Sequence, residues 1–148
     1  MSMIQDMAVE HFAYGIEREW YDNPLIAYIR SQGDMTESAI DVWADVLLDT
    51  KDKWVSGQPY AVIVDLTHPN QGITPYSRSR TRDLIDSVPT DELTYVSLLL
   101  PRTFINQLFR VFLRSSIFQR PTLQIRIHHT LDEALLWLHR KIAQTSTS

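Results

Sequence analysis

Apolar runs separated by polar turns predict five strands along this chain. The most apolar run, residues 60–66, is rich in β-branched side chains and lies between Pro59 and a polar loop. Such a run is typical of a strand buried on both faces, within a parallel sheet that is covered by helices. We therefore expect 60–66 to be the central strand. The other expected strands are 11–20, 25–30, 93–100 and 123–128.

The first two strands are expected to form an antiparallel hairpin. Residues 21–24 read Tyr-Asp-Asn-Pro, a sequence that favours a turn, and they separate two short apolar segments. Charges at Glu17, Arg18 and Glu19 favour an edge position for 11–20, because charged side chains discourage pairing with other chains.

Helical periodicity and capping residues predict about four helices. Asp34 or Thr36 is expected to cap a helix running to about residue 55, and Thr74 with Pro75 opens a second helix. A third helix is expected from about 103 to 118. Thr130 and Glu133 form a capping box for the last helix, which is expected to end near residue 143.

The resulting order is β-β-α-β-α-β-α-β-α, which predicts an α/β fold. Strictly alternating strands and helices with right-handed crossovers give a mostly parallel five-stranded sheet, here with an N-terminal antiparallel edge hairpin. We expect a flexible lead-in over 1–10, one domain over 11–143, and a frayed tail over 144–148.

Composition narrows the class of protein. The chain has 148 residues, a net charge of −4 and no cysteine, which argues against generic nucleic-acid binding and excludes disulfides and thiolate metal sites. No stretch reaches the roughly 20 apolar residues of a membrane span, and the first residues do not resemble a signal peptide. We expect a cytoplasmic protein that needs no cofactor.

The succession of elements and the close of the chain resemble the STAS domain family, the fold of sporulation anti-anti-sigma factors. Residues 132–138 read Asp-Glu-Ala-Leu-Leu-Trp-Leu, similar to the acidic-Ala-x-x-Trp-Leu ending of the anti-anti-sigma-like branch, often described as STAS/SEC14-like. The resemblance spans about 11–143. It implies a non-enzymatic regulatory or binding module, and its SEC14 side implies an apolar ligand or lipid.

The chain departs from that family at the regulatory turn. Anti-anti-sigma factors carry a phosphorylatable Ser in an Asp-Ser-Ser-Gly-like turn after the central strand, whereas residues 72–77 here read Gly-Ile-Thr-Pro-Tyr-Ser. Thr74 lies near the acceptor position and Ser77 one turn further on. These two are the candidate phosphorylation sites that the resemblance implies, although the motif itself is absent.

A ligand site is expected at the carboxyl ends of the parallel strands. Ligands of open α/β sheets gather outside these ends, where helix N-termini expose N–H groups to anions. The alternative is that the threonines there only cap helices and that the charged residues are solvated. The candidates for a small-anion site are His68, Thr74, Arg78, Arg102, Thr103 and His129.

Catalytic and metal sites are less well indicated. His128 and His129 are neighbours on a strand, so their side chains point to opposite faces and do not chelate one ion. We predict no metal. An enzyme, as a third alternative, needs Asp65, His68 and His129 to converge on one pocket.

The segment 104–118 is more hydrophobic than a helix facing one core requires. Its apolar arc is about twice the roughly 100° expected, with a narrow polar strip. A second apolar face implies intrachain cover, a partner subunit or protein, or contact with an anionic membrane surface. We predict protein–protein contact, in the form of a homodimer. The interface candidates are Arg110, Val111, Leu113, Arg114, Ile117 and Phe118.

Overall fold

One six-stranded mixed sheet organises the fold. The computed structural model describes residues 9–21, 26–54, 57–68, 74–88, 92–101 and 121–147. The strands lie in the order β1-β2-β3-β4-β5-β6. Pairing is antiparallel from β1 to β3 and parallel from β3 to β6. Their bounds are Glu10–His11, Ile16–Tyr21, Ile26–Ser31, Tyr60–Asp65, Thr94–Leu99 and Leu123–His128.

The expected central strand is confirmed. β4 pairs with β3 on one side and β5 on the other, and its residues from Ala61 to Val64 are buried. Both neighbours pair with it in parallel, as expected for a strand inside a parallel sheet. The α/β class and the parallel pairing therefore follow from the apolar runs.

The N-terminal part differs from the prediction in strand number. The expected strand 11–20 is two strands, β1 and β2, separated by the 3-10 turn Ala13–Gly15. Tyr14 has φ 61° and Gly15 has φ 75°, a left-handed pair that reverses the chain. As a result β2 is paired on both sides, and the edge strand is the two-residue β1, which begins inside the expected lead-in.

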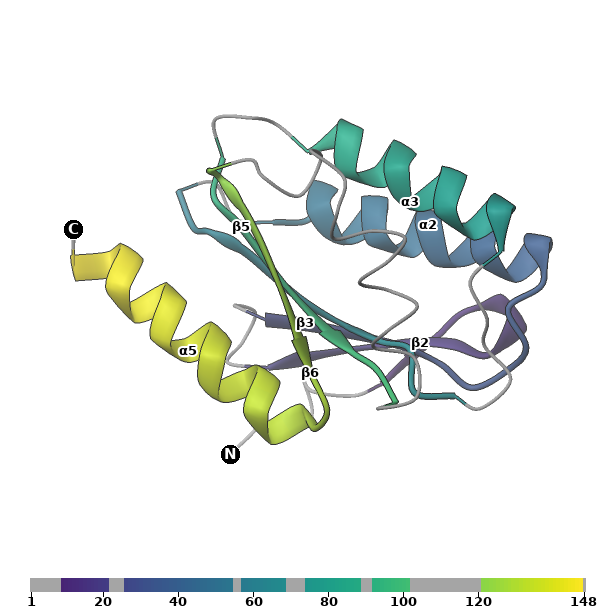
Figure 1. Cartoon of the computed structure of the whole chain (residues 1–148), viewed down its shortest axis with the longest axis horizontal. Helices are drawn as coiled ribbons and strands as arrows, with labels where there is room; N and C mark the ends of the chain where they lie inside the picture. Colours follow the sequence, from purple (N-terminus) through teal and green to yellow (C-terminus); the bar gives the residue numbers. More distant parts are fainter. Residues whose placement is uncertain are drawn as a thin grey trace.

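Three α-helices lie in the part of the chain that the structure describes. They are α2 (Glu37–Asp52), α3 (Pro75–Ser87) and α5 (Leu131–Thr147). Figure 1 shows α2 and α3 side by side on one face of the sheet and α5 on the opposite face. Helix α5 runs through the tail that was expected to fray. The expected helix 103–118 lies outside the described residues.

The predicted caps are present. The Thr36 hydroxyl accepts a hydrogen bond from the Ala39 N–H at 3.2 Å. Thr74 and Ser77 form a reciprocal capping box at the start of α3. At the start of α5, the Thr130 hydroxyl accepts from the Glu133 N–H, and the Glu133 carboxylate accepts from the Thr130 N–H, both at 3.2 Å. Local sequence therefore sets these helix starts.

The sheet separates two apolar cores. Helix α5 contributes Ala134, Trp137 and Leu138 to the core on its face. Helix α2 contributes Ile40, Trp43 and other apolar residues to the core on the opposite face. Helix α3 differs from both, since none of its residues is fully buried. Helix α3 therefore packs incompletely against the sheet, and a space remains between them.

Candidate functional site

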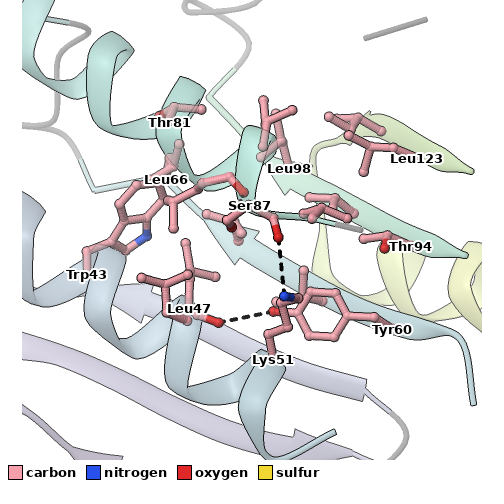
Figure 2. Close-up of a pocket in the computed structure, with 18 residues that line it drawn as sticks. Trp43, Leu47, Lys51, Tyr60, Leu66, Thr81, Ser87, Thr94, Leu98 and Leu123 are labelled. Carbon is pink, nitrogen blue, oxygen red and sulfur yellow. Dashed lines mark hydrogen bonds between the residues drawn. The ribbon is translucent and has the colours of Figure 1, made fainter. Parts of the chain in front are cut away.

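An apolar pocket of about 140 Å³ lies between the sheet and helices α2 and α3 (Figure 2). Its floor consists of alternate residues from three parallel strands. Val62, Val96 and Ile125 form one row across β4, β5 and β6, since Val62 pairs with Val96 and Val96 with Ile125. Period-2 alternation places all three on the same face of the sheet. The floor is therefore a continuous aliphatic surface.

The two helices supply the walls of this pocket. On α2, the residues at i, i+4 and i+8 are Trp43, Leu47 and Lys51, which share one helix face. On α3, Leu84 and Ile85 line the pocket and are only half-buried. An apolar pocket with few polar groups is the usual form of a small-molecule site.

Most of the polar side chains that line the pocket gather at one end of it. Tyr60 and Thr94 are paired at the amino ends of β4 and β5, and Lys51 lies near the C-terminal end of α2. Lys51 Nζ donates to the Ser87 carbonyl at 3.2 Å, and the Tyr60 hydroxyl donates to the Leu47 carbonyl at 3.4 Å. Burial raises the pKa of the Tyr60 phenol, so this hydroxyl stays protonated. Figure 2 shows this end opposite Trp43 and Leu66.

The residues predicted from the sequence lie away from this pocket. His68 follows β4, His129 follows β6, and Thr74 and Arg78 lie at the start of α3, toward the carboxyl ends of the strands. Arg102 and Thr103 lie outside the described residues, as do all six interface candidates between 110 and 118. In the described sheet the strand order has no reversal, and such a reversal is what opens a crevice at the carboxyl edge of many α/β folds.

Asp65 and His129 belong to separate networks. The Asp65 carboxylate accepts from the Tyr28 hydroxyl at 2.5 Å and from the Thr67 N–H at 2.9 Å. Nδ1 of His129 lies 3.3 Å from the Leu100 carbonyl oxygen. Asp65 thus closes the turn that follows its strand, a structural role common for aspartate in this position.

The candidate phosphorylation sites are engaged in a helix cap. The Thr74 hydroxyl accepts from the Ser77 N–H at 3.0 Å, and the Ser77 hydroxyl accepts from the Thr74 N–H at 2.9 Å. Thr74 is exposed and Ser77 is half-buried. Both hydroxyls therefore contribute to the start of α3, whatever else they do.

A serine–histidine pair that was not predicted lies on the α5 face. Ser97 Oγ is 2.7 Å from Nδ1 of His128, and the His128 ring centroid is 5.5 Å from that of Trp137. Burial lowers the pKa of the His128 imidazole. The Ser97 side chain is 0% exposed, so it does not meet a substrate as a nucleophile. The pair is best explained as a satisfied hydrogen bond in the core.

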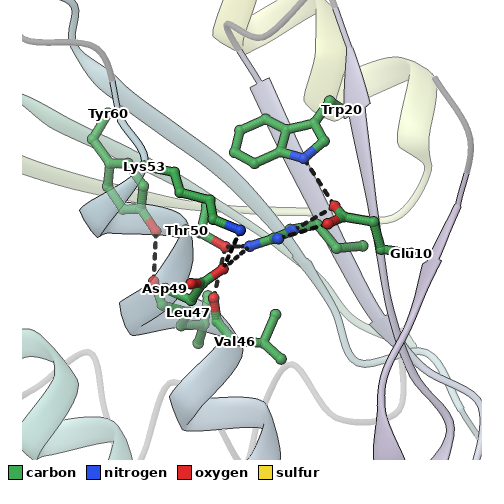
Figure 3. A network of polar contacts seen from close by, with 9 residues as sticks. Glu10, Trp20, Val46, Leu47, Asp49, Thr50, Lys53 and Tyr60 are labelled. Atoms are coloured by element: carbon green, nitrogen blue, oxygen red, sulfur yellow. Dashed lines mark hydrogen bonds and ion pairs between the residues drawn. The ribbon is translucent and has the colours of Figure 1, made fainter. Parts of the chain in front are cut away.

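A buried arginine joins three elements on the α2 face (Figure 3). Arg18 is 1% exposed and donates to both Glu10 carboxylate oxygens, at 2.7 and 2.8 Å. Its third nitrogen donates to Asp49 and Thr50, both at 2.9 Å. The Arg18 side chain thereby ties β1 and β2 to α2. With its donors engaged in this way, Arg18 is a structural residue.

The described residues contain neither a metal-binding cluster nor a membrane-spanning helix. These residues contain no group of three or more His, Cys, Asp or Glu side chains arranged to hold a metal ion. The helices among them also include none that is long and apolar enough to cross a membrane.

No family model, curated protein or solved structure matches this chain. The resemblance to STAS domains therefore stays a prediction from the sequence.

Proposed function

We propose that this protein is a non-enzymatic binding module that takes a small apolar ligand in the pocket between the sheet, α2 and α3. The observation that carries this proposal is the aliphatic floor formed by Val62, Val96 and Ile125. This floor lies beneath helix α3, none of whose residues is fully buried. The proposal agrees with the apolar ligand implied by the STAS/SEC14-like resemblance.

The size of the pocket sets the size of the ligand. A cavity of about 140 Å³ is close to the engineered cavity of about 150 Å³ that stays dry and binds benzene. By the same comparison the pocket encloses roughly six carbon atoms of a ligand. Because the pocket is open on one side, the end of an eight-carbon chain can extend out of it. Moving each methylene from water into such a site is worth about 0.8 kcal/mol, so a short alkyl chain binds measurably.

The test is a titration with 1-octanol, followed by the amide chemical shifts of the protein. We expect saturable shifts at residues of the floor, such as Val96 and Ile125, and at Leu84 of α3. Val96→Phe fills the floor with a ring and should abolish these shifts. Leu136→Phe is the matched control, because Leu136 is 54% exposed on α5 and lies on the opposite face of the sheet.

Two outcomes would contradict the proposal. One is that 1-octanol causes no saturable shifts at any concentration it reaches in water. The other is that Val96→Phe, shown to be folded by its circular dichroism spectrum, binds 1-octanol as tightly as the unaltered protein.

The protein–protein contact predicted from 104–118 is a second proposal. It rests on the apolar pattern of the sequence alone, because that segment lies outside the described residues. Its test is the state of association in solution, described in the Discussion.

A further inference from the structure

Lys51 lies at the polar end of the apolar pocket. Trp43, Leu47 and Lys51 are spaced by four residues on α2, so the helix that presents two apolar walls also presents an ammonium group. Figure 2 shows Lys51 beside Tyr60 and close to Thr94, at the amino ends of the strands. The aliphatic floor thus ends at a positive charge.

The Lys51 ammonium keeps donors available for a ligand. Its Nζ donates to the Ser87 carbonyl at 3.2 Å, and an ammonium group has three donors. No carboxylate within the described ranges forms an ion pair with Lys51. Lys53, two residues further along, is instead paired with Asp49 at 3.2 Å.

The ends of two helices make this position sensitive to charge. Helices α2 and α3 both end near Lys51, at Asp52 and Ser87, and the C-terminal end of a helix carries a partial negative charge. An anion is therefore stable here only while Lys51 is present. Without that charge, the same place should reject an anion.

We propose that the pocket takes a small apolar carboxylic acid, with its alkyl chain on the aliphatic floor and its carboxylate on Lys51. This inference rests on the proposed function and adds the chemical class of the ligand. A charge-assisted hydrogen bond to a carboxylate is roughly twice as strong as a neutral one. Octanoate should therefore bind about tenfold more tightly than 1-octanol, which has the same chain length.

The experiment compares octanoate and 1-octanol at pH 7 on three proteins. The unaltered protein should prefer octanoate. Lys51→Gln should reverse the preference, so that octanoate binds more weakly than 1-octanol, because the helix ends now repel the carboxylate. Lys53→Gln removes a charge from the same helix end but not from the pocket, and it should keep the original preference.

The outcomes separate this inference from the proposed function. If both ligands bind and their ratio is the same in the unaltered protein and in Lys51→Gln, the assignment of Lys51 is wrong while the apolar site stands. If neither ligand binds any of the three proteins, the apolar site itself is wrong. If Lys53→Gln loses the preference as fully as Lys51→Gln, the effect is one of net charge and the assignment is also wrong.

Discussion

Replacing Glu10 by Gln tests whether the Arg18 network stabilises the fold. The carboxylate of Glu10 accepts two hydrogen bonds from Arg18 and one from Trp20 Nε1, at 3.0 Å. Glutamine offers one oxygen and one NH2 group, so an N–H of the buried Arg18 faces a donor in its place. The substitution thus leaves part of a buried guanidinium unpaired.

The expected loss of stability depends on how far each of the two side chains is buried. Arg18 is 1% exposed, whereas the Glu10 side chain is 39% exposed. Hydrogen bonds to charged groups contribute about 1.5–3 kcal/mol each, but solvent screens a partly exposed carboxylate. We therefore expect Glu10→Gln to lower the free energy of unfolding by about 2 kcal/mol at pH 7. For a chain of this size that is a fall of roughly 4–8 °C in Tm.

The pH dependence provides an internal check. Hydrogen bonding to Arg18 lowers the pKa of Glu10 in the folded state. A carboxyl whose folded pKa is lowered stabilises the fold above its unfolded pKa, about 4.3 for Glu, and this contribution is lost as the pH falls through the folded pKa. The difference between Glu10→Gln and the unaltered protein should therefore shrink as the pH falls below about 4.3.

The assay is urea unfolding at several pH values. Asp45→Asn is a suitable control, since Asp45 is exposed on α2, and it should change stability by less than about 0.5 kcal/mol. The reasoning is refuted if Glu10→Gln costs no more than this control at pH 7. It is also refuted if the cost of Glu10→Gln is the same at pH 3 as at pH 7.

Three further predictions address the turn, the half-buried histidine and self-association. In urea unfolding, Gly15→Ala should lower the free energy of unfolding by roughly 2 kcal/mol and Gly57→Ala by about 1 kcal/mol. Both residues have positive φ, but only at Gly15 would an added Cβ meet a neighbouring atom, the backbone nitrogen of Gly33 at 3.0 Å. Equal losses for the two variants would contradict this reasoning. By NMR titration, His128 should show a pKa below that of an unperturbed histidine. The contribution of His128 to the free energy of unfolding should therefore fall as the pH drops below about 6.5. His128→Gln should lack this part of the pH dependence. A normal pKa would contradict the burial argument. In analytical ultracentrifugation, the predicted homodimer should dissociate on dilution and be weakened by Ile117→Asp or Phe118→Asp, and a monomer at every concentration would end that proposal.

Local features of the sequence could be predicted because neighbouring residues decide them. The run 60–66 is apolar on both faces, which is enough to place it inside a parallel sheet. Thr74 before Pro75, and Thr130 before Glu133, set helix starts through contacts over three residues. The α/β class follows from the order of such segments.

The N-terminal strands and the Arg18 network depended on tertiary pairing. Charged residues at 17–19 favoured an edge strand, but the turn at Tyr14 and Gly15 adds β1 beside β2. Arg18 is then buried, because Glu10 and Asp49 reach it from residues 8 and 31 positions away. A charge is tolerated in the interior only when partners of this kind surround it.

What the sequence determined by itself was therefore the parallel strands β4 to β6, the starts of α2, α3 and α5, and the place of β4 inside the sheet. What only the tertiary structure decided was which side chains meet. The pocket joins Lys51 of α2 with Ile125 of β6, and the pair Ser97 and His128 joins β5 with β6. Strand register and the face that each helix covers decide such meetings, and both arise from packing between distant segments rather than from the pattern within any one of them.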